Sequence, residues 1–212
     1  MIPQEQRGEA WKQWRRNKLG ASEISAILGC GFLSIGELFD IKLGLRQPEE
    51  ENDAMRRGND LEGQAREAFE LETGRSVYPL VCVHPDYPWL IASLDGITID
   101  KKIAVEIKCP GKKTHEATIK SREIPSYYIP QLQQIMSVTG LDEIYYFSFD
   151  PDSSILLKLS RDDEYIKVLI EKARLFHQLL MQGFDEIKRH EEKMDSMKDE
   201  LYRIIDDADS AI

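Results

Sequence analysis

The sequence predicts an α/β domain with a central mixed β-sheet flanked by helices, followed by a C-terminal helical segment. Apolar residues recur at helical spacing up to Gly74; after it come short runs rich in Val, Ile and Tyr, bounded by Pro, Asp and Gly. Helical spacing returns after residue 124, and this order of helices, strands and helices is typical of an α/β core. We expect one domain over residues 1–160, helical over 1–74 and carrying the sheet over 75–160, with helices over 161–212.

Composition limits the class of protein. The chain has 212 residues, 42% of them hydrophobic and 31% charged, with a net charge of −10. It contains no apolar run near the roughly 20 residues of a membrane span and no secretory signal, which predicts a cytoplasmic protein without a membrane partner. Its three cysteines are far apart and are expected to be reduced thiols. The negative charge argues against nucleic-acid binding by the whole surface but allows a local basic groove.

The first 74 residues are expected to form helices. Residues 9–19 predict a helix or an irregular basic segment, and Ser22 is expected to cap a short helix that ends at Gly29. Ser34 with Glu37 three residues later has the spacing of a capping box, which predicts the start of the next helix. A further helix is predicted over 54–74.

The remaining elements follow in order. Strands are predicted over 76–85, 89–99 and 102–109, with a hairpin turn at Asp100–Lys102 between the last two. A helix is expected from Pro125 to Gly140, and a strand pair over 143–150 and 154–160. From Asp162 the pattern is helical to the end, with a break expected near Gly183 because glycine is a poor helix former.

Acidic and basic residues stand inside the predicted hairpin. Glu106 and Lys108 alternate with apolar residues and so share one face of a strand, and Asp95 lies on the strand before it. Two carboxylates close together repel each other unless a cation lies between them, and Mg²⁺ commonly takes one or two carboxylates. An Asp followed by Glu-x-Lys is the arrangement of metal-dependent nucleases. A cross-strand salt bridge explains the same residues equally well from this motif alone.

Several segments in order resemble the lambda-type (phage alkaline) exonucleases, a YqaJ-like viral recombinase family with a restriction-endonuclease-like core. The resemblance covers about Trp11 to Asp150. Its segments are Trp11 with Arg15, LGASEISAILG (19–29), RRGNDLEGQAREAF (56–69), HPDYPWLIASLDG (84–96), AVEIKCP (104–110) and YYIPQLQQIMSVTG (127–140). Leu94 departs from the family, in which many members have Pro, and is expected to change the local turn only slightly.

The resemblance implies roles for the residues around Glu106. Asp95, Glu106 and the Ile107 carbonyl would bind Mg²⁺, for which Mn²⁺ could substitute, and Lys108 would position the attacking water. Glu62 would complete the site through a second metal or a water, and Gln131 would hold the nucleophile or the phosphate. The alternatives are a solvated helix residue for Glu62 and a backbone-bonding residue for Gln131. Tyr128 is expected to pack rather than to act in catalysis.

The resemblance also implies contacts to the DNA end. Arg15, Ser22 and Ser93 would form a pocket for a terminal 5′-phosphate, and Arg suits this because its guanidinium can bind phosphate oxygens with two hydrogen bonds. Met55 stands where relatives carry an apolar wedge that separates the strands, although a core position is the alternative.

The activity implied is Mg²⁺-dependent 5′-to-3′ digestion of one strand of linear duplex DNA to mononucleotides, leaving 3′ overhangs for recombination. Relatives are trimeric rings that work with a single-strand annealing protein, so a homo-oligomer and such a partner are expected, in a bacterial cell carrying a phage or prophage. The alternatives are an endonuclease or a helicase-linked nuclease with the same core, and a catalytically silent adaptor that binds DNA ends.

The C-terminal segment carries a narrow apolar stripe on a highly charged helix. The stripe consists of Phe184, Ile187, Met194, Met197, Leu201 and Ile204. It predicts either packing on the domain's own core or a coiled-coil-like contact with another subunit or a partner.

Overall fold

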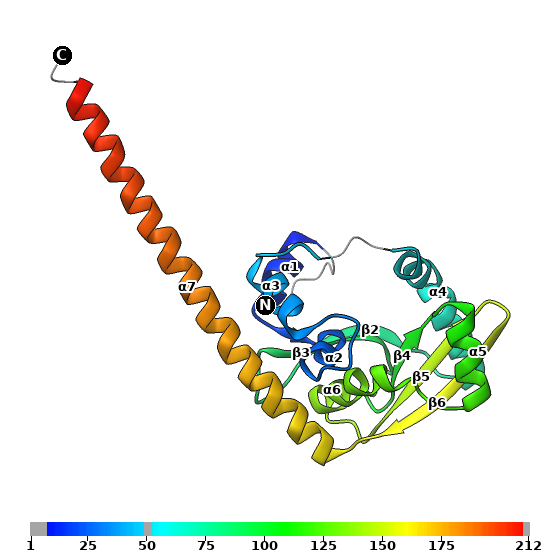
Figure 1. Ribbon diagram of the computed structural model, residues 1–212. Coiled ribbons are helices and arrows are strands. Elements are labelled where there is room, and N and C mark those ends of the chain that lie inside the picture. Colours follow the sequence, from blue (N-terminus) through cyan, green and yellow to red (C-terminus); the bar gives the residue numbers. More distant parts are fainter. Residues whose placement is uncertain (1–7, 49–51, 210–212) are drawn as a thin grey trace.

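The computed structural model describes residues 8–48 and 52–209 and has the predicted mixed α/β architecture (Figure 1). The strands are β1 (Leu19–Gly20), β2 (Tyr78–Val83), β3 (Leu90–Ile97), β4 (Ala104–Lys108), β5 (Glu143–Asp150) and β6 (Ser153–Ser160). The helices are α1 (Glu9–Arg15), η1 (Ala21–Glu23), α2 (Ile24–Ile27), α3 (Ile35–Leu43), α4 (Asp53–Thr73), α5 (Lys112–Ser121), η2 (Ser126–Tyr128), α6 (Ile129–Thr139) and α7 (Asp163–Asp209).

The local signals for helix ends have mixed outcomes. The Ser34 capping box is confirmed, since Ser34 Oγ accepts a hydrogen bond from the Glu37 N–H and the Glu37 carboxylate accepts from the Ser34 N–H. The prediction that Ser22 caps a helix is wrong: Ser22 lies inside η1, and the Glu23 carboxylate instead accepts the N–H of Gly20. Helix α5 was not predicted.

The six strands form one mixed sheet with the order β1-β3-β4-β5-β6, and β2 also pairs with β3. The pairs β2–β3, β3–β4 and β5–β6 are antiparallel, which confirms the hairpin around Asp100 and the predicted strand pair. The pairs β1–β3 and β4–β5 are parallel.

Helices cover both faces of the sheet. On one face, α6 and the first part of α7 bury Leu94, Tyr146 and Leu132 in the larger core. On the other face, α4 buries Ala65 and Phe69 against strands β4 and β5, whose contributions are Val105, Ile107, Phe147 and Phe149. Because side chains alternate along β4, Glu106 and Lys108 point to the α6 face while Val105 and Ile107 point to α4.

Strand β3 contains a β-bulge at Asp95–Gly96. Tyr78 and Leu80 of β2 pair with Ile97 and Leu94, so one residue of β2 lies opposite two of β3, Asp95 and Gly96. Such an extra residue bends a strand and redirects its side chains. A Cβ on Gly96 would lie 2.6 Å from Val77 Cγ2 and 2.8 Å from Val105 Cγ1, so the bulge fits only without a side chain there. Leu94 is a buried strand residue rather than part of a turn.

Helix α7 is one unbroken helix, so the break predicted near Gly183 is wrong. Gly183 faces α3, where an added Cβ would meet both Leu43 Cδ atoms at 3.0 Å, and its missing side chain lets the two helices approach closely. Figure 1 shows that α7 runs along the body and then continues far beyond it. Among residues 8–48 and 52–209, no helix combines the length and the apolar character that crossing a bilayer requires.

Candidate active site

The site lies where the sheet divides beside β3. Strand β1 pairs with β3 at Leu90 and Ile91, whereas β4 pairs with it only at Gly96 and Ile97. Between these short ladders, Ser93 and Asp95 pair with neither β1 nor β4. Asp95 occupies part of this fork, since its Oδ2 accepts the Ile107 N–H at 2.8 Å.

Glu106 stands at the centre of the site and is 2% exposed. Its Oε1 accepts hydrogen bonds from Lys108 Nζ, at 2.6 Å, and from the amide of Gln131 on α6. Its Oε2 is buried and has no hydrogen-bond partner among the described residues. The structure therefore brings together Asp95, Glu106, Lys108 and Gln131, as the sequence predicted.

Burial and neighbouring charges shift the pKa values of the site residues. Burial, and next the charge of Glu106, raise the pKa of Asp95 to about 8, with a smaller contribution from Glu62. Burial opposes the charge on Lys108, but Glu106 and Asp95 outweigh it and raise the pKa of Lys108 above its usual value. The Lys108 ammonium also lies 5.1 Å from the centre of the Tyr128 ring, so Tyr128 contacts the site as well as packing.

The donor set fits a hard divalent cation. A buried carboxylate oxygen without a partner is costly, and a cation beside Glu106 Oε2 would remove that cost and the repulsion from Asp95. Within the described part of the chain, no three His, Cys, Asp or Glu side chains form a metal-holding group. A site here therefore rests on two carboxylates and needs backbone or solvent oxygens for its other ligands.

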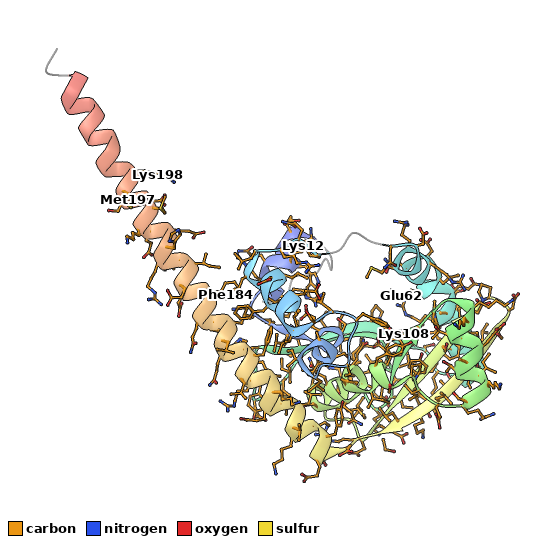
Figure 2. All side chains as sticks on the ribbon, in the orientation of Figure 1. Lys12, Glu62, Lys108, Phe184, Met197 and Lys198 are labelled. Atoms are coloured by element: carbon orange, nitrogen blue, oxygen red, sulfur yellow. The ribbon has the colours of Figure 1, made fainter. Side chains whose placement is uncertain are left out.

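Glu62 lies close enough to the site to affect the pKa of Asp95, and its carboxylate is paired with an arginine. It lies on α4, on the side of the helix that buries Ala65 and Phe69, and Figure 2 shows it together with Lys108. Its carboxylate binds Arg66 Nη2 at 2.6 Å, and Arg66 Nε donates to the Asp95 carbonyl at 3.0 Å. Arg66 thus links α4 to the bulge, a role that the sequence analysis missed although its i,i+4 spacing from Glu62 predicts the ion pair.

A second, partly buried charge cluster lies beside β1 and contains Arg15, whose side chain is 30% exposed. Arg15 Nη2 donates to Glu23 Oε1 at 3.1 Å, and Lys42 Nζ binds Glu23 Oε2 at 2.8 Å. Lys42, whose side chain is 6% exposed, also donates to the Lys18 carbonyl at 2.6 Å. A Cβ on Gly20 would lie 2.7 Å from Arg15 Nη2, so this glycine makes room for the guanidinium.

The charge balance of this cluster favours ionisation. Burial works against the charge of Glu23, but Lys42 and Arg15 outweigh it and lower the pKa of Glu23. The family resemblance implies a role for Arg15, whereas Glu23 and Lys42 were not predicted. No spacing rule links residues 23 and 42, and a buried lysine in an amphipathic helix looks like an ordinary surface residue in the sequence.

Ser22 and Ser93 lie on neighbouring segments, Ser22 in η1 just after β1 and Ser93 within β3. Gly20 pairs with Ile91 in the parallel β1–β3 ladder, and each serine comes two residues later in its segment. Both serines are exposed. Met55 lies in the first turn of α4 and is 49% exposed, so it is not the core residue of the alternative interpretation.

His84 and His115 are bound to neighbouring protein groups. His84 Nδ1 accepts the N–H groups of Asp86 and Tyr87 and holds a turn. His115 is 2% exposed, and its ring nitrogens bond the hydroxyls of Ser148 and Ser153.

Comparisons with known proteins identify the family and agree with the fold. A family model described as the YqaJ-like viral recombinase domain matches residues 10–142. A search of curated proteins finds no match. An alkaline exonuclease, LHK-Exo from Laribacter hongkongensis, is 30% identical with a TM-score of 0.76, over 88% of this chain and 100% of that chain. Its complex with dAMP gives the same values. A phage related exonuclease from Haemophilus somnus shares the fold at 18% identity and a TM-score of 0.59, over 82% of this chain and 96% of that chain.

Proposed function

Because the chain belongs to the YqaJ-like viral recombinase domain family, we propose that it is a metal-dependent DNA exonuclease of the phage-recombination type. More specifically, it digests one strand of linear duplex DNA from a 5′-phosphorylated end to mononucleotides. The surviving 3′ single strand is then available for annealing. The alkaline exonuclease that resembles this chain over its full length supports the reaction class.

The observation that carries the proposal is the state of Glu106. A salt bridge with Lys108 uses only one of its carboxylate oxygens, and the other is buried and unpartnered beside Asp95. A purely structural ion pair would gain stability from satisfying both oxygens. This arrangement favours a functional site over the cross-strand salt bridge that the sequence left open.

A divalent cation, Mg²⁺ with Mn²⁺ as a substitute, would be held by Asp95, Glu106 and the Ile107 carbonyl. Bound there, it would polarise the scissile phosphate and lower the pKa of a coordinated water. Glu62 would contribute indirectly, since its carboxylate already binds Arg66.

The side chains on the α6 face position the reacting groups. Lys108 keeps its proton, because its pKa is raised, and its ammonium donates hydrogen bonds to a phosphate oxygen and to the attacking water. Gln131 holds Glu106 in place through its amide. Its other polar atom, the amide oxygen, can accept a hydrogen bond from the attacking water.

A pocket for the terminal 5′-phosphate would lie at the other end of the fork. Arg15 supplies the positive charge, and Glu23 with Lys42 fixes its position. Ser22 and Ser93 supply hydroxyl donors on neighbouring segments. Met55, exposed on α4, is the proposed strand wedge. A trimeric ring around the duplex and a single-strand annealing partner remain proposals; a ring with a basic channel would reconcile the net charge of −10 with a DNA substrate.

The experiment is digestion of linear duplex DNA labelled at either end of one strand, carrying a 5′-phosphate or a 5′-hydroxyl, with and without Mg²⁺. We expect Mg²⁺-dependent release of mononucleotides from the phosphorylated 5′ end and an intact closed-circular control. Cutting of the circle would identify an endonuclease. Binding without cleavage in either Mg²⁺ or Mn²⁺ would identify an adaptor and overturn the proposal.

A further inference from the structure

Helix α7 carries one heptad register along its whole length. The residues that pack on the body recur at alternating steps of three and four and are Ile166, Leu169, Ala173, Phe176 and Leu180, all at most 4% exposed. These are the a and d positions of a coiled-coil repeat. The protein's own core covers this seam over the first half of the helix, up to Phe184 and Ile187.

The same register continues where the body ends. The next a and d positions after Gly183 are Ile187, His190, Met194, Met197, Leu201, Ile204 and Ala208. Met194 and Met197 are 41% and 55% exposed, and Figure 2 shows Met197 on the part of α7 that extends away from the body. Among the side chains that the structure describes, His190, Met194 and Met197 are therefore exposed. The a and d positions from Ile187 to Ile204 extend over about 26 Å at 1.5 Å per residue.

The charges beside this seam argue against a parallel pair of identical helices. In a parallel pair, each g position faces the e position five residues later in the partner. Glu186 would then face Glu191, and Lys193 would face Lys198. Both contacts are repulsive and would weaken a parallel pair.

In an antiparallel pair, Glu191, Lys193 and Lys198 instead face residues of opposite charge. With Met194 opposite Met197 of a second copy, Glu191 faces Lys198, and the twofold symmetry makes this contact twice. Lys193 then stands opposite position 200, which is Glu in the sequence. One like-charge contact remains at the edge, between Glu186 and position 207, and there Arg189 already pairs with Glu186 at 2.6 Å.

We propose that residues 187–204 of α7 form an antiparallel two-stranded coiled coil with a second copy of this chain, centred between Met194 and Met197. The occupant is a second copy because the charge pattern is complementary to itself in this register. The two bodies would lie at opposite ends of the paired segment. The pairing is independent of any assembly that the bodies form through other surfaces, and it would double the number of chains in that assembly.

The test measures the mass of the full-length protein in solution over a range of concentrations, by light scattering and analytical ultracentrifugation. Met194→Glu with Met197→Glu should halve the mass of the assembly. Lys198→Glu alone and Glu191→Lys alone should each weaken the association roughly tenfold, because each replaces two attractive contacts by repulsive ones. The double variant Glu191→Lys/Lys198→Glu should restore it. Lys188→Glu, at an outer b position where the side chain is 75% exposed, is the control of matched charge.

The single charge reversals also separate the two orientations. In a parallel pair, Lys198→Glu would face Lys193 and strengthen the association, which would overturn the antiparallel proposal. An unchanged mass in the Met194→Glu/Met197→Glu variant would overturn the pairing altogether. The readout does not depend on nuclease activity, so its failure leaves the proposed function intact.

Discussion

Two charge clusters, one around the partly buried Glu23 and one around the buried Glu106, lie beside the fork in the sheet and differ in how their carboxylates are compensated. Beside β1, Glu23 is compensated on both oxygens, by Arg15 on one and by Lys42 and the Gly20 N–H on the other. Beside β4, Glu106 has hydrogen-bond partners on one oxygen only within the described part of the chain, and its charge acts on the neighbouring Asp95. The pKa of Glu23 is lowered, whereas that of Asp95 is raised.

This difference in charge compensation distinguishes a cluster that stabilises the fold from a cluster suited to binding an ion or a substrate. The cluster around Glu23 has the balance of charge and hydrogen bonds that makes a buried ion pair tolerable, so it fixes the backbone and the Arg15 guanidinium. The cluster around Glu106 carries one negative charge too many for its burial, and such imbalance is typical of sites that bind an ion or a reacting group. Removing a charge should therefore have opposite effects on stability in the two places.

The largest effect is expected at Glu106. Glu106→Gln should lower the rate of DNA digestion by roughly 10³-fold or more, because the buried charge that would hold a cation is lost. The free energy of unfolding in EDTA should stay unchanged or rise, since a repulsive neighbour of Asp95 disappears. Nuclease assays and urea titrations of one preparation measure both. Loss of activity through unfolding would contradict the comparison.

The next effect concerns Lys42. Lys42→Met keeps the length of the side chain but removes its charge, and should lower the free energy of unfolding by about 3 kcal/mol because Glu23 loses a buried partner. Adding Glu23→Gln to this variant should recover part of the loss, which a double-mutant cycle in urea measures. Additive effects of the two substitutions would show that the pair is not coupled.

The pH dependence of stability should differ in sign between the clusters. The raised pKa of Asp95 means that the folded protein keeps a proton that the unfolded chain has already lost. Between about pH 4 and pH 8 this group therefore lowers the free energy of unfolding as pH rises, by at most about 1.4 kcal/mol per unit. The lowered pKa of Glu23 instead gives stability that is present above its usual pKa and is lost as the pH falls through its folded value.

Urea unfolding in EDTA from pH 5 to pH 8 isolates Asp95 when the wild-type protein is compared with Asp95→Asn, since the other titrating groups are common to both proteins. The wild-type protein should lose stability across the window and Asp95→Asn should lose less. Equal slopes for the two proteins would show that Asp95 is ionised in the folded state.

The smallest effect is expected at Arg15. Arg15→Ala should reduce the preference for a 5′-phosphate over a 5′-hydroxyl by roughly tenfold, as expected for the loss of a charge-assisted hydrogen bond. The neighbouring Arg16→Ala is the matched control, because Arg16 donates to the Leu43 carbonyl and contacts the Phe184 ring instead. A ratio of initial rates that is the same for all three proteins would remove Arg15 from the pocket.

Much of the fold was readable in the sequence because its signals are local. The Ser34 capping box, the glycine at the end of α4 and the Asp100 turn each need only a few neighbouring residues. The spacing of Asp95, Glu106 and Lys108 also sufficed to predict that they lie close together, since the hairpin places their two strands side by side.

The features that escaped prediction depend on contacts between distant segments. Strand β1 is two residues long and exists because it pairs with β3. Helix α5 has few apolar positions, and its buried residues are His115 and Thr118, which carry no amphipathic signal. Gly183 favours a break by propensity, but its contact with Leu43 on α3 outweighs that preference.

Because α7 is continuous through Gly183, the body fixes the direction in which the apolar stripe of the tail faces around the helix axis. Each residue of an α-helix turns the chain by about 100°, so inserting one residue between positions 187 and 190 would rotate the distal stripe by that angle around the helix axis without disturbing the domain. Inserting seven residues would nearly return it to its starting direction. The number of residues in this segment therefore determines the direction, around the helix axis, in which a partner bound to the tail lies relative to the catalytic body.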